Sequence, residues 1–232
     1  RDAAFTVRKG EIVGIAGLMG AGRTELAMSL FGHSYGRDIT GTVEIGGKVV
    51  DTSTVSKAVA AGLSYVTEDR KSLGLVLEEP IVRNITLANL FGVSKNGILD
   101  KRRETQVAEG YRTAMAIRTP GVFQKVVNLS GGNQQKVVLS KWLFTDPQVL
   151  ILDEPTRGID VGAKFEIYSI MNDLAAQGRG VVMISSEMPE LLGMCDRIYV
   201  VNEGRIMGEL SREEASQERI MALILKNDGK AA

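Results

Sequence analysis

Apolar and polar residues follow two patterns along the chain, one typical of buried strands and one typical of amphipathic helices. Short continuous apolar runs predict strands at 11–17, within 62–70, at 148–156 and at 180–187. Runs that alternate around turn residues predict β-hairpins at 41–51, turning at Gly46-Gly47, and at 196–210, turning at Asn202-Glu203-Gly204. Apolar residues at helical spacing predict helices at 24–32, 163–178 and within 212–226, and a mostly helical stretch over 80–125 with breaks near Gly97 and at 119–121.

Strands that alternate with helices predict an α/β fold with a mostly parallel sheet covered on both faces. The helical block interrupts that alternation, so we expect it to form a separate lobe. Near the end of the chain, Ser211 and Glu214 have the spacing of a capping box, which predicts that the last helix starts close to them.

Charge and composition argue against several classes of protein. Lys+Arg and Asp+Glu both number 28, so the chain lacks the basic excess that a nucleic-acid binder usually carries. No run approaches the ~20 apolar residues of a membrane-spanning helix, and no signal peptide is visible, so we expect any membrane association to run through a partner. The single cysteine, Cys195, is interpreted as a buried apolar side chain, and the single histidine, His33, as a solvated loop residue.

The stretch GLMGAGRTE, residues 17–25, lies between a predicted strand and a predicted helix, which is the context of a phosphate-binding loop. Its glycines let the backbone curl so that N–H groups point at phosphate oxygens, and the helix adds the positive end of its dipole. Thr24 supplies a hydroxyl of the kind that ligates Mg²⁺. The pattern G-x-x-x-x-G-K-[ST] is broken by Arg23, so the loop alone does not distinguish a phosphate site from a plain glycine turn.

The stretch LSGGNQQ, residues 129–135, predicts a second anion-binding helix terminus. Ser130 occupies the position of a helix N-cap, and Gly131-Gly132 leave the backbone amides uncovered. An apolar face with Val138 and Trp142 follows. An ordinary capped helix would account for S-G-G alone, but not for the whole string.

The stretch VLILDEPT, residues 149–156, carries two acids to the end of a strand, where open α/β sheets bind ligands. Asp153 is placed to hold Mg²⁺, directly or through water. Glu154 is placed to orient or deprotonate an attacking water. The alternative is a strand that ends in a solvated acidic turn.

Together and in this order, the three motifs resemble those of an ATP-binding cassette (ABC) ATPase. More narrowly, GLMGAGRTEL, EDRKSLGLVL, LSGGNQQKV, DEPTRGIDVGAK and SSEMPELLGMCDRI resemble the C-terminal cassette of bacterial ribose, galactose and xylose importers, in which one polypeptide carries two cassettes. The resemblance implies one P-loop (RecA-like) nucleotide-binding domain over 1–232, with a small antiparallel β region and a helical signature lobe. Its parts are expected at about 1–78 and 146–210 for the α/β core, 79–145 for the lobe and 211–227 for the C-terminal helix. The abrupt start at Arg1 is what a piece of a tandem polypeptide would show.

The resemblance also implies a role for each motif. Residues 17–24 resemble the Walker A loop, 149–154 the Walker B strand and 129–135 the signature, which binds the γ-phosphate held by the opposite cassette. Asp160 falls in the D-loop at the dimer seam, Glu68 at the Q-loop glutamine and Ser186 at the switch histidine. The expected catalytic residues are therefore Glu154, Ser186 and Glu68, and the expected magnesium ligands are Thr24 and Asp153. The expected nucleotide-binding residues are Gly17, Met19, Gly20, Ala21, Gly22, Arg23, Thr24, Glu25, Ser130, Gly131, Gly132 and Gln134.

Three positions of this chain's own site depart from the family pattern, namely Arg23, Glu68 and Ser186, whereas Glu154 and the signature are retained. Guanidinium keeps the charge of lysine but is planar and bulkier, and serine cannot carry a positive charge. We therefore expect the chain to bind ATP–Mg²⁺ and turn it over slowly, while its signature completes a better site on the partner cassette.

The resemblance therefore implies the second cassette of an ABC importer that powers monosaccharide uptake through ATP hydrolysis. Its expected partners are the N-terminal cassette of the same polypeptide, membrane permease subunits and, indirectly, a periplasmic sugar-binding protein, at the cytoplasmic face of the bacterial inner membrane. The main alternative is a regulatory half that binds ATP without hydrolysing it. A soluble ABC protein acting on ribosomes or DNA is disfavoured by the zero net charge, and a P-loop small-molecule kinase would lack LSGGNQQ.

Overall fold

A computed structural model describes residues 3–226, which divide into two compact units. The first unit comprises the residues up to Tyr65, the segment Gln148–Glu154 and the residues from Met171 onward. The second comprises Val66–Pro147 and Pro155–Ile170.

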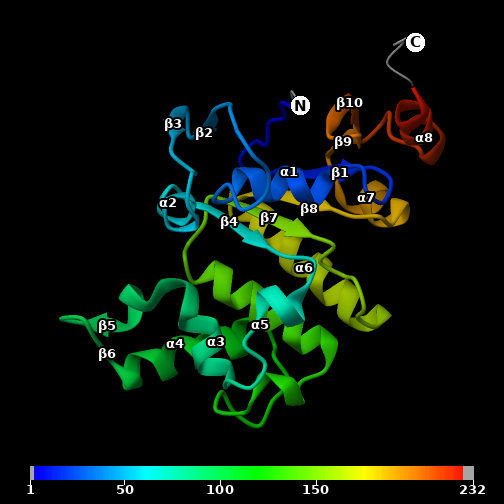
Figure 1. The fold of residues 1–232 in the computed structure, drawn as a ribbon. Coiled ribbons are helices and arrows are strands. Elements are labelled where there is room, and N and C mark those ends of the chain that lie inside the picture. Colours follow the sequence, from blue (N-terminus) through cyan, green and yellow to red (C-terminus); the bar gives the residue numbers. More distant parts are fainter. Residues whose placement is uncertain (1–2, 227–232) are drawn as a thin grey trace. The chain divides into compact units, whose positions relative to one another are not determined.

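The first unit is built on a six-stranded sheet with strand order β10-β9-β1-β8-β7-β4 (Figure 1). The strands are β1 Ile12–Ala16, β4 Leu63–Val66, β7 Val149–Asp153, β8 Gly180–Ile184, β9 Arg197–Asn202 and β10 Arg205–Ser211. β1 runs parallel to β8 and β9, β7 runs parallel to β8, and only the pairing of β10 with β9 is antiparallel among the registers of this sheet that we describe. The predicted α/β fold with a mostly parallel sheet is therefore confirmed.

The central strands are buried along almost their whole length, as their continuous apolar runs predict. Ile15 pairs with Ile184, and Ile184 in turn pairs with Asp153 across the neighbouring strand. Since these strands are parallel, their carboxyl ends meet at one edge of the sheet. This register brings the segments that follow β1, β7 and β8 together.

The two predicted hairpins are present in the first unit. β2 Val43–Ile45 pairs with β3 Lys48–Val50, and both turn glycines, Gly46 and Gly47, have the positive φ that a type I′ turn requires. The second hairpin joins β9 to β10 through Glu203 and Gly204, which also have positive φ.

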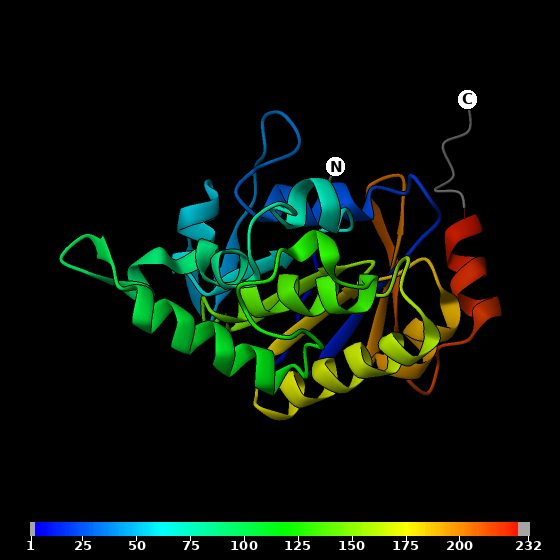
Figure 2. The same ribbon diagram turned by 90° about the horizontal axis from the view of Figure 1, so that it is seen from below.

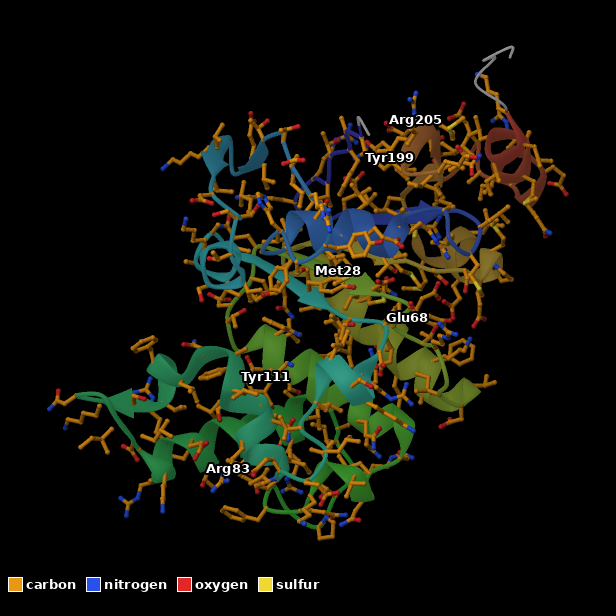
Figure 3. The ribbon with its side chains drawn as sticks, viewed as in Figure 1. Met28, Glu68, Arg83, Tyr111, Tyr199 and Arg205 are labelled. Atoms are coloured by element: carbon orange, nitrogen blue, oxygen red, sulfur yellow. The ribbon has the colours of Figure 1, made fainter. Side chains whose placement is uncertain are left out.

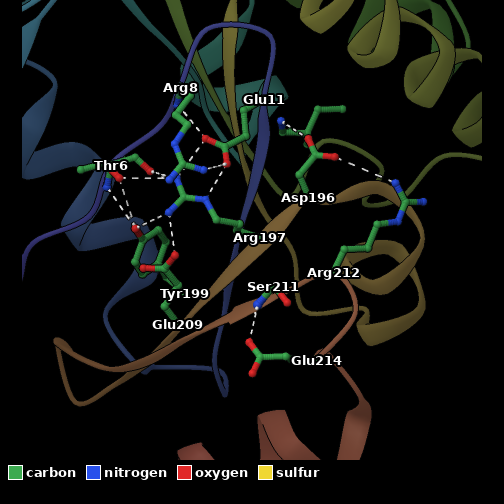
Figure 4. Close-up of polar contacts among 11 residues, drawn as sticks. Thr6, Arg8, Glu11, Asp196, Arg197, Tyr199, Glu209, Ser211, Arg212 and Glu214 are labelled. Atoms are coloured by element: carbon green, nitrogen blue, oxygen red, sulfur yellow. Dashed lines mark hydrogen bonds and ion pairs between the residues drawn. The ribbon is translucent and has the colours of Figure 1, made fainter.

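The helices of the first unit are α1 Arg23–Leu30, α2 Val55–Ala60, α7 Met188–Met194, α8 Gln217–Leu225 and the last turns of α6 Val161–Ala176. The N-cap of α8 is Ser216, whose side chain accepts from the backbone N–H of Arg219. The predicted capping box at Ser211 and Glu214 is wrong as a helix start. The Glu214 carboxylate does accept from the Ser211 backbone N–H at 3.2 Å, but the two residues close a turn that precedes the helix (Figure 4).

A buried ion pair fastens the segment before β1 to the β9–β10 hairpin (Figure 4). The Arg197 guanidinium donates to both carboxylate oxygens of Glu11, at 2.5 and 2.9 Å, and to the Glu209 carboxylate at 2.7 Å. Burial is the largest single influence on the pKa of Glu11 and acts to raise it, but the hydrogen bonds from Arg197 and from the Arg8 backbone, together with the charges of both arginines, leave that pKa lowered. The fork geometry of arginine suits this paired carboxylate, so Arg197 holds the segment before β1 on the sheet.

The second unit is mostly helical, and its elements follow the predicted breaks (Figure 2). They are η1 Arg70–Gly74, α3 Ile81–Thr86, η2 Leu87–Val93, α4 Lys101–Ala114, η3 Val126–Asn128, α5 Gly131–Leu143 and the part of α6 up to Ile170. The break near Gly97 is a small hairpin of β5 Ser94–Lys95 and β6 Ile98–Leu99, which turns through Asn96 and Gly97 with positive φ.

Candidate nucleotide site

The glycine loop connects β1 directly to α1, which is the strand–loop–helix order that a phosphate loop needs. Gly20 and Gly22 have φ values of 79° and 94°. A Cβ atom at Gly17 would lie 2.5 Å from the Val201 carbonyl oxygen, so only glycine fits there. The N-cap of α1 is Gly22 and provides no side-chain cap, so the first-turn amides remain available to an anion.

Two other loop residues differ in exposure. Met19 is 87% exposed, whereas Ala21 is buried and its carbonyl accepts from the Gly204 backbone N–H at 2.7 Å. The β9–β10 turn therefore supports the loop from one side. Glu25 follows in the first turn of α1.

Arg23, in the position of the expected lysine, is buried, with 8% of its surface exposed. Its Nη1 donates to the Ser185 carbonyl at 2.7 Å, and its Nη2 lies 3.6 Å from Oε1 of Glu154. The guanidinium is therefore anchored at the carboxyl ends of β7 and β8. The sequence did not reveal this anchor, because it depends on a backbone carbonyl 162 residues away.

Asp153 ends β7 and is fully buried. Its Oδ2 accepts a hydrogen bond from the Tyr65 hydroxyl at 2.8 Å, and its Oδ1 is buried with no hydrogen-bond partner among the described residues. Burial raises the pKa of Asp153, and the nearby hydroxyls of Thr24 and Tyr65 act in the opposite direction. A buried, unpaired carboxylate oxygen beside a threonine hydroxyl fits the oxygen ligands that Mg²⁺ prefers.

Glu154 has a left-handed backbone with φ of 46°, which is uncommon outside glycine and concentrates at functional sites. Its Oε2 accepts from the Ser186 hydroxyl at 3.1 Å, while its Oε1 faces Arg23. Burial raises the pKa of Glu154, while Ser186 and Arg23 counteract this rise. Both carboxylate oxygens are thus engaged by this chain's own residues.

The signature lies in the second unit, where Ser130 is the N-cap of α5. Its hydroxyl does not cap the helix but accepts from the Asn133 side-chain amide at 3.0 Å. A small pocket adjoins it, lined by Arg118, Ser130, Gly132, Asn133, Asp160, Gly162, Ala163 and Glu166. The expected D-loop residue Asp160 therefore lies beside the signature serine within this unit.

Gln134, one of the expected nucleotide-binding residues, is held by the backbone of its own chain. Its side chain is 5% exposed, and its Nε2 donates to the carbonyls of Val126 and Leu129. The neighbouring Asn133, rather than Gln134, lines the pocket. The reason is the helical phase of α5, which turns residue 134 toward the preceding η3 turn.

Glu68, labelled in Figure 3, follows β4. It forms an ion pair with Arg157 inside the second unit. The nearby Arg70 donates to the carbonyl of Arg157 at 2.8 Å and to that of Gly158 at 3.2 Å. The segment after β4 is thus joined to the segment before α6. The carboxylate expected to serve catalysis is held here by an arginine that sequence reasoning had not singled out.

The glycines of the signature are required by close packing. A Cβ atom at Gly132 would lie 2.5 Å from the Cβ of Ala163 in α6. We expect Gly132→Ala to lower the free energy of unfolding by about 1–3 kcal/mol, because the added methyl group overpacks the contact. Denaturant unfolding would measure this. The matched control is Gly110→Ala in α4, where a Cβ meets no atom within 4 Å and alanine should stabilise the helix. Equal effects of the two changes would contradict the packing argument.

A P-loop α/β unit, a carboxylate pair at a strand end and a glycine-started signature helix define an ATP-binding cassette. The chain belongs to the ABC transporter family, whose sequence profile matches residues 1–157. It is 62% identical over 96% of its length to the L-arabinose transport ATP-binding protein AraG of Geobacillus stearothermophilus, and 56% identical over 95% to the xylose import ATP-binding protein XylG of Geobacillus kaustophilus. The ribose import ATP-binding protein RbsA of Clostridium perfringens is 51% identical over 96% of the chain.

The chain spans less than half the length of these curated relatives, namely 43%, 44% and 44%. Solved structures share its fold. A dimeric ATP-binding cassette in a post-hydrolysis state with ADP and Pi has a TM-score of 0.76 at 19% identity, covering 91% of this chain and 90% of that one. The ADP conformation of another cassette has a TM-score of 0.76 at 20% identity, covering 95% and 89%. Within residues 3–226, no helix combines the length and the apolar character needed to cross a bilayer.

Proposed function

We propose that this chain binds and slowly hydrolyses ATP as the second cassette of an ABC importer for monosaccharides. The observation that carries the proposal is the register of β1, β7 and β8, which places the glycine loop beside Asp153 and Glu154. Relatives named as arabinose, xylose and ribose transport proteins support the substrate class.

Each residue of the site has a chemical task in this proposal. The amides of the glycine loop and of the first turn of α1 bind the phosphates. Asp153 and Thr24 are the residues that would hold Mg²⁺, which when bound would neutralise charge on the phosphate oxygens. Glu154 orients or deprotonates the attacking water, and Ser186 holds the carboxylate through its hydroxyl.

The contacts of Arg23 support slow turnover at this chain's own site. A carboxylate that faces a guanidinium is a weaker base, and a guanidinium anchored on the Ser185 carbonyl is not free to sit among the phosphates. The same observation favours the second candidate, a regulatory half that binds ATP without hydrolysing it. The variants considered in the Discussion distinguish the two.

The signature supports the proposal that this chain completes the ATP site of the N-terminal cassette of the same polypeptide. Ser130 has no capping role, so the start of α5 is available to an anion from outside the chain. In this proposal the tandem polypeptide acts at the cytoplasmic face of the inner membrane. It works with permease subunits and, through them, a periplasmic sugar-binding protein.

We test this role with Ser130→Glu in the polypeptide that carries both cassettes. A carboxylate at this helix start repels the γ-phosphate of the partner site, so we expect transport-coupled ATP hydrolysis to fall at least about 100-fold, comparable to the loss of one transition-state donor. The control is Ser56→Glu on the exposed face of α2, which should leave hydrolysis unchanged. Full hydrolysis in Ser130→Glu would refute the proposal that this signature completes the ATP site of the partner cassette.

A further inference from the structure

The hydroxyl of Tyr65 connects an edge strand of the sheet to the first acid of the carboxylate pair. Tyr65 lies in β4, which neighbours β7, and its hydroxyl donates to Oδ2 of Asp153 at 2.8 Å. Both side chains are buried, with exposed fractions of 7% and 0%. The ring of Tyr65 also packs against Phe31 at 5.8 Å between centroids.

This hydrogen bond makes the two carboxylate oxygens of Asp153 unequal. Oδ2 is held by Tyr65, whereas Oδ1 is buried with no hydrogen-bond partner among the described residues. A carboxylate with one oxygen fixed cannot rotate freely about its terminal bond. Since buried acceptors are almost always paired, an unpaired Oδ1 in this fixed orientation points to an absent ligand.

We propose that Tyr65 is a positioning residue for the divalent cation that accompanies ATP, because its hydroxyl fixes Asp153 with Oδ1 turned toward the metal. This inference rests on the proposed nucleotide site. Tyr65 would act through Asp153 and would not itself hold the metal. Groups that orient a metal ligand through a hydrogen bond commonly change metal affinity 10- to 100-fold when they are removed.

A purely structural role for Tyr65 leads to a different expectation. Phenylalanine keeps the ring and its packing on Phe31 but removes the hydroxyl. If the ring alone matters, Tyr65→Phe leaves the metal affinity untouched. If the hydroxyl positions Asp153, Tyr65→Phe weakens metal binding while the phosphate loop still binds nucleotide.

The experiment measures Mn²⁺ binding to the purified chain by electron paramagnetic resonance in the presence of a non-hydrolysable ATP analogue. Binding of the same analogue without metal is measured in parallel. We expect Tyr65→Phe to weaken Mn²⁺ binding about 10-fold and to leave metal-free nucleotide binding unchanged. Tyr35→Phe, at a tyrosine that is 53% exposed, is the matched control and should change neither quantity.

A double-mutant cycle with Asp153→Asn separates positioning from general damage to the fold. If Tyr65 acts through Asp153, adding Tyr65→Phe to Asp153→Asn causes no further loss of Mn²⁺ affinity. Unchanged Mn²⁺ affinity in a Tyr65→Phe protein that binds nucleotide would overturn the inference, as would equal losses in both backgrounds. Absence of nucleotide binding in the unmodified chain would instead overturn the proposed function, and the inference with it.

Discussion

Replacing Glu154 by glutamine is expected to lower kcat for ATP hydrolysis by about 100- to 10,000-fold, the range that a positioned general base contributes. The amide keeps the shape of the side chain and its hydrogen bond with Ser186, but it cannot accept a proton from water. Steady-state phosphate release by the purified chain would measure the loss. Glu44→Gln, at an exposed position of β2, is the matched control and should retain full activity.

The pH dependence of the same reaction provides a second test of Glu154 as the general base. Burial raises the pKa of its carboxyl above the ordinary value of 4.5. Because the ionised carboxylate is the base, kcat should fall as the pH drops through this raised pKa, and the acidic limb should lie above pH 4.5. Full activity in Glu154→Gln would exclude this residue as the base. Complete inactivity of the parent chain would instead favour the regulatory alternative.

Replacing Arg23 by lysine is expected to raise kcat, by up to about 100-fold. One preorganised charge at the transition state is commonly worth a factor of roughly 100 to 1000. Lysine cannot reproduce the two-armed contact with the Ser185 carbonyl and Glu154, so the carboxylate is released and the ammonium becomes free to reach the phosphates. The measurement is steady-state hydrolysis at saturating ATP and Mg²⁺.

Two controls accompany the Arg23 variant. Arg37→Lys, at an exposed loop position, tests whether an arginine-to-lysine change as such alters the rate. The double variant Arg23→Lys with Glu154→Gln should be as inactive as Glu154→Gln alone. A fall in kcat on Arg23→Lys would show that the guanidinium assists the reaction, and the account of slow turnover would then be wrong.

The fold could be predicted from the sequence wherever the local pattern of apolar and polar residues reflects which positions are buried. The strands β1 and β8, and β7 up to Asp153, lack polar side chains because both faces of a parallel sheet are covered. The hairpin at Gly46-Gly47 followed from the backbone freedom of its turn residues. The start of α8 was missed because Ser211 and Glu214 form the same hydrogen bond in a turn as they would in a capping box.

Only those residues of the candidate site that belong to sequence motifs could be predicted. Contacts between residues far apart in the sequence could not. Asp153, Glu154 and the glycine loop stand at strand ends that the apolar runs reveal. Tyr65 looks like one more apolar position of a strand, and nothing in the sequence tells that its hydroxyl meets a carboxylate 88 residues away. The sequence did not show that Gln134 is buried while Asn133 lines the pocket, because one residue of helical phase, about 100°, decides which side chain is buried.

The close contacts of the signature glycines have a mechanical consequence. A Cβ at Gly131 would lie 2.9 Å from Arg70 and 3.1 Å from the Gly158 carbonyl, and Arg70 itself is bonded to the backbone of Arg157 and Gly158. Any side chain larger than that of glycine at position 131 would therefore have to displace Arg70 or the segment before α6. Because Arg70 is hydrogen-bonded to that segment, a shift of the residues after β4 would change the surroundings of the start of α5 directly.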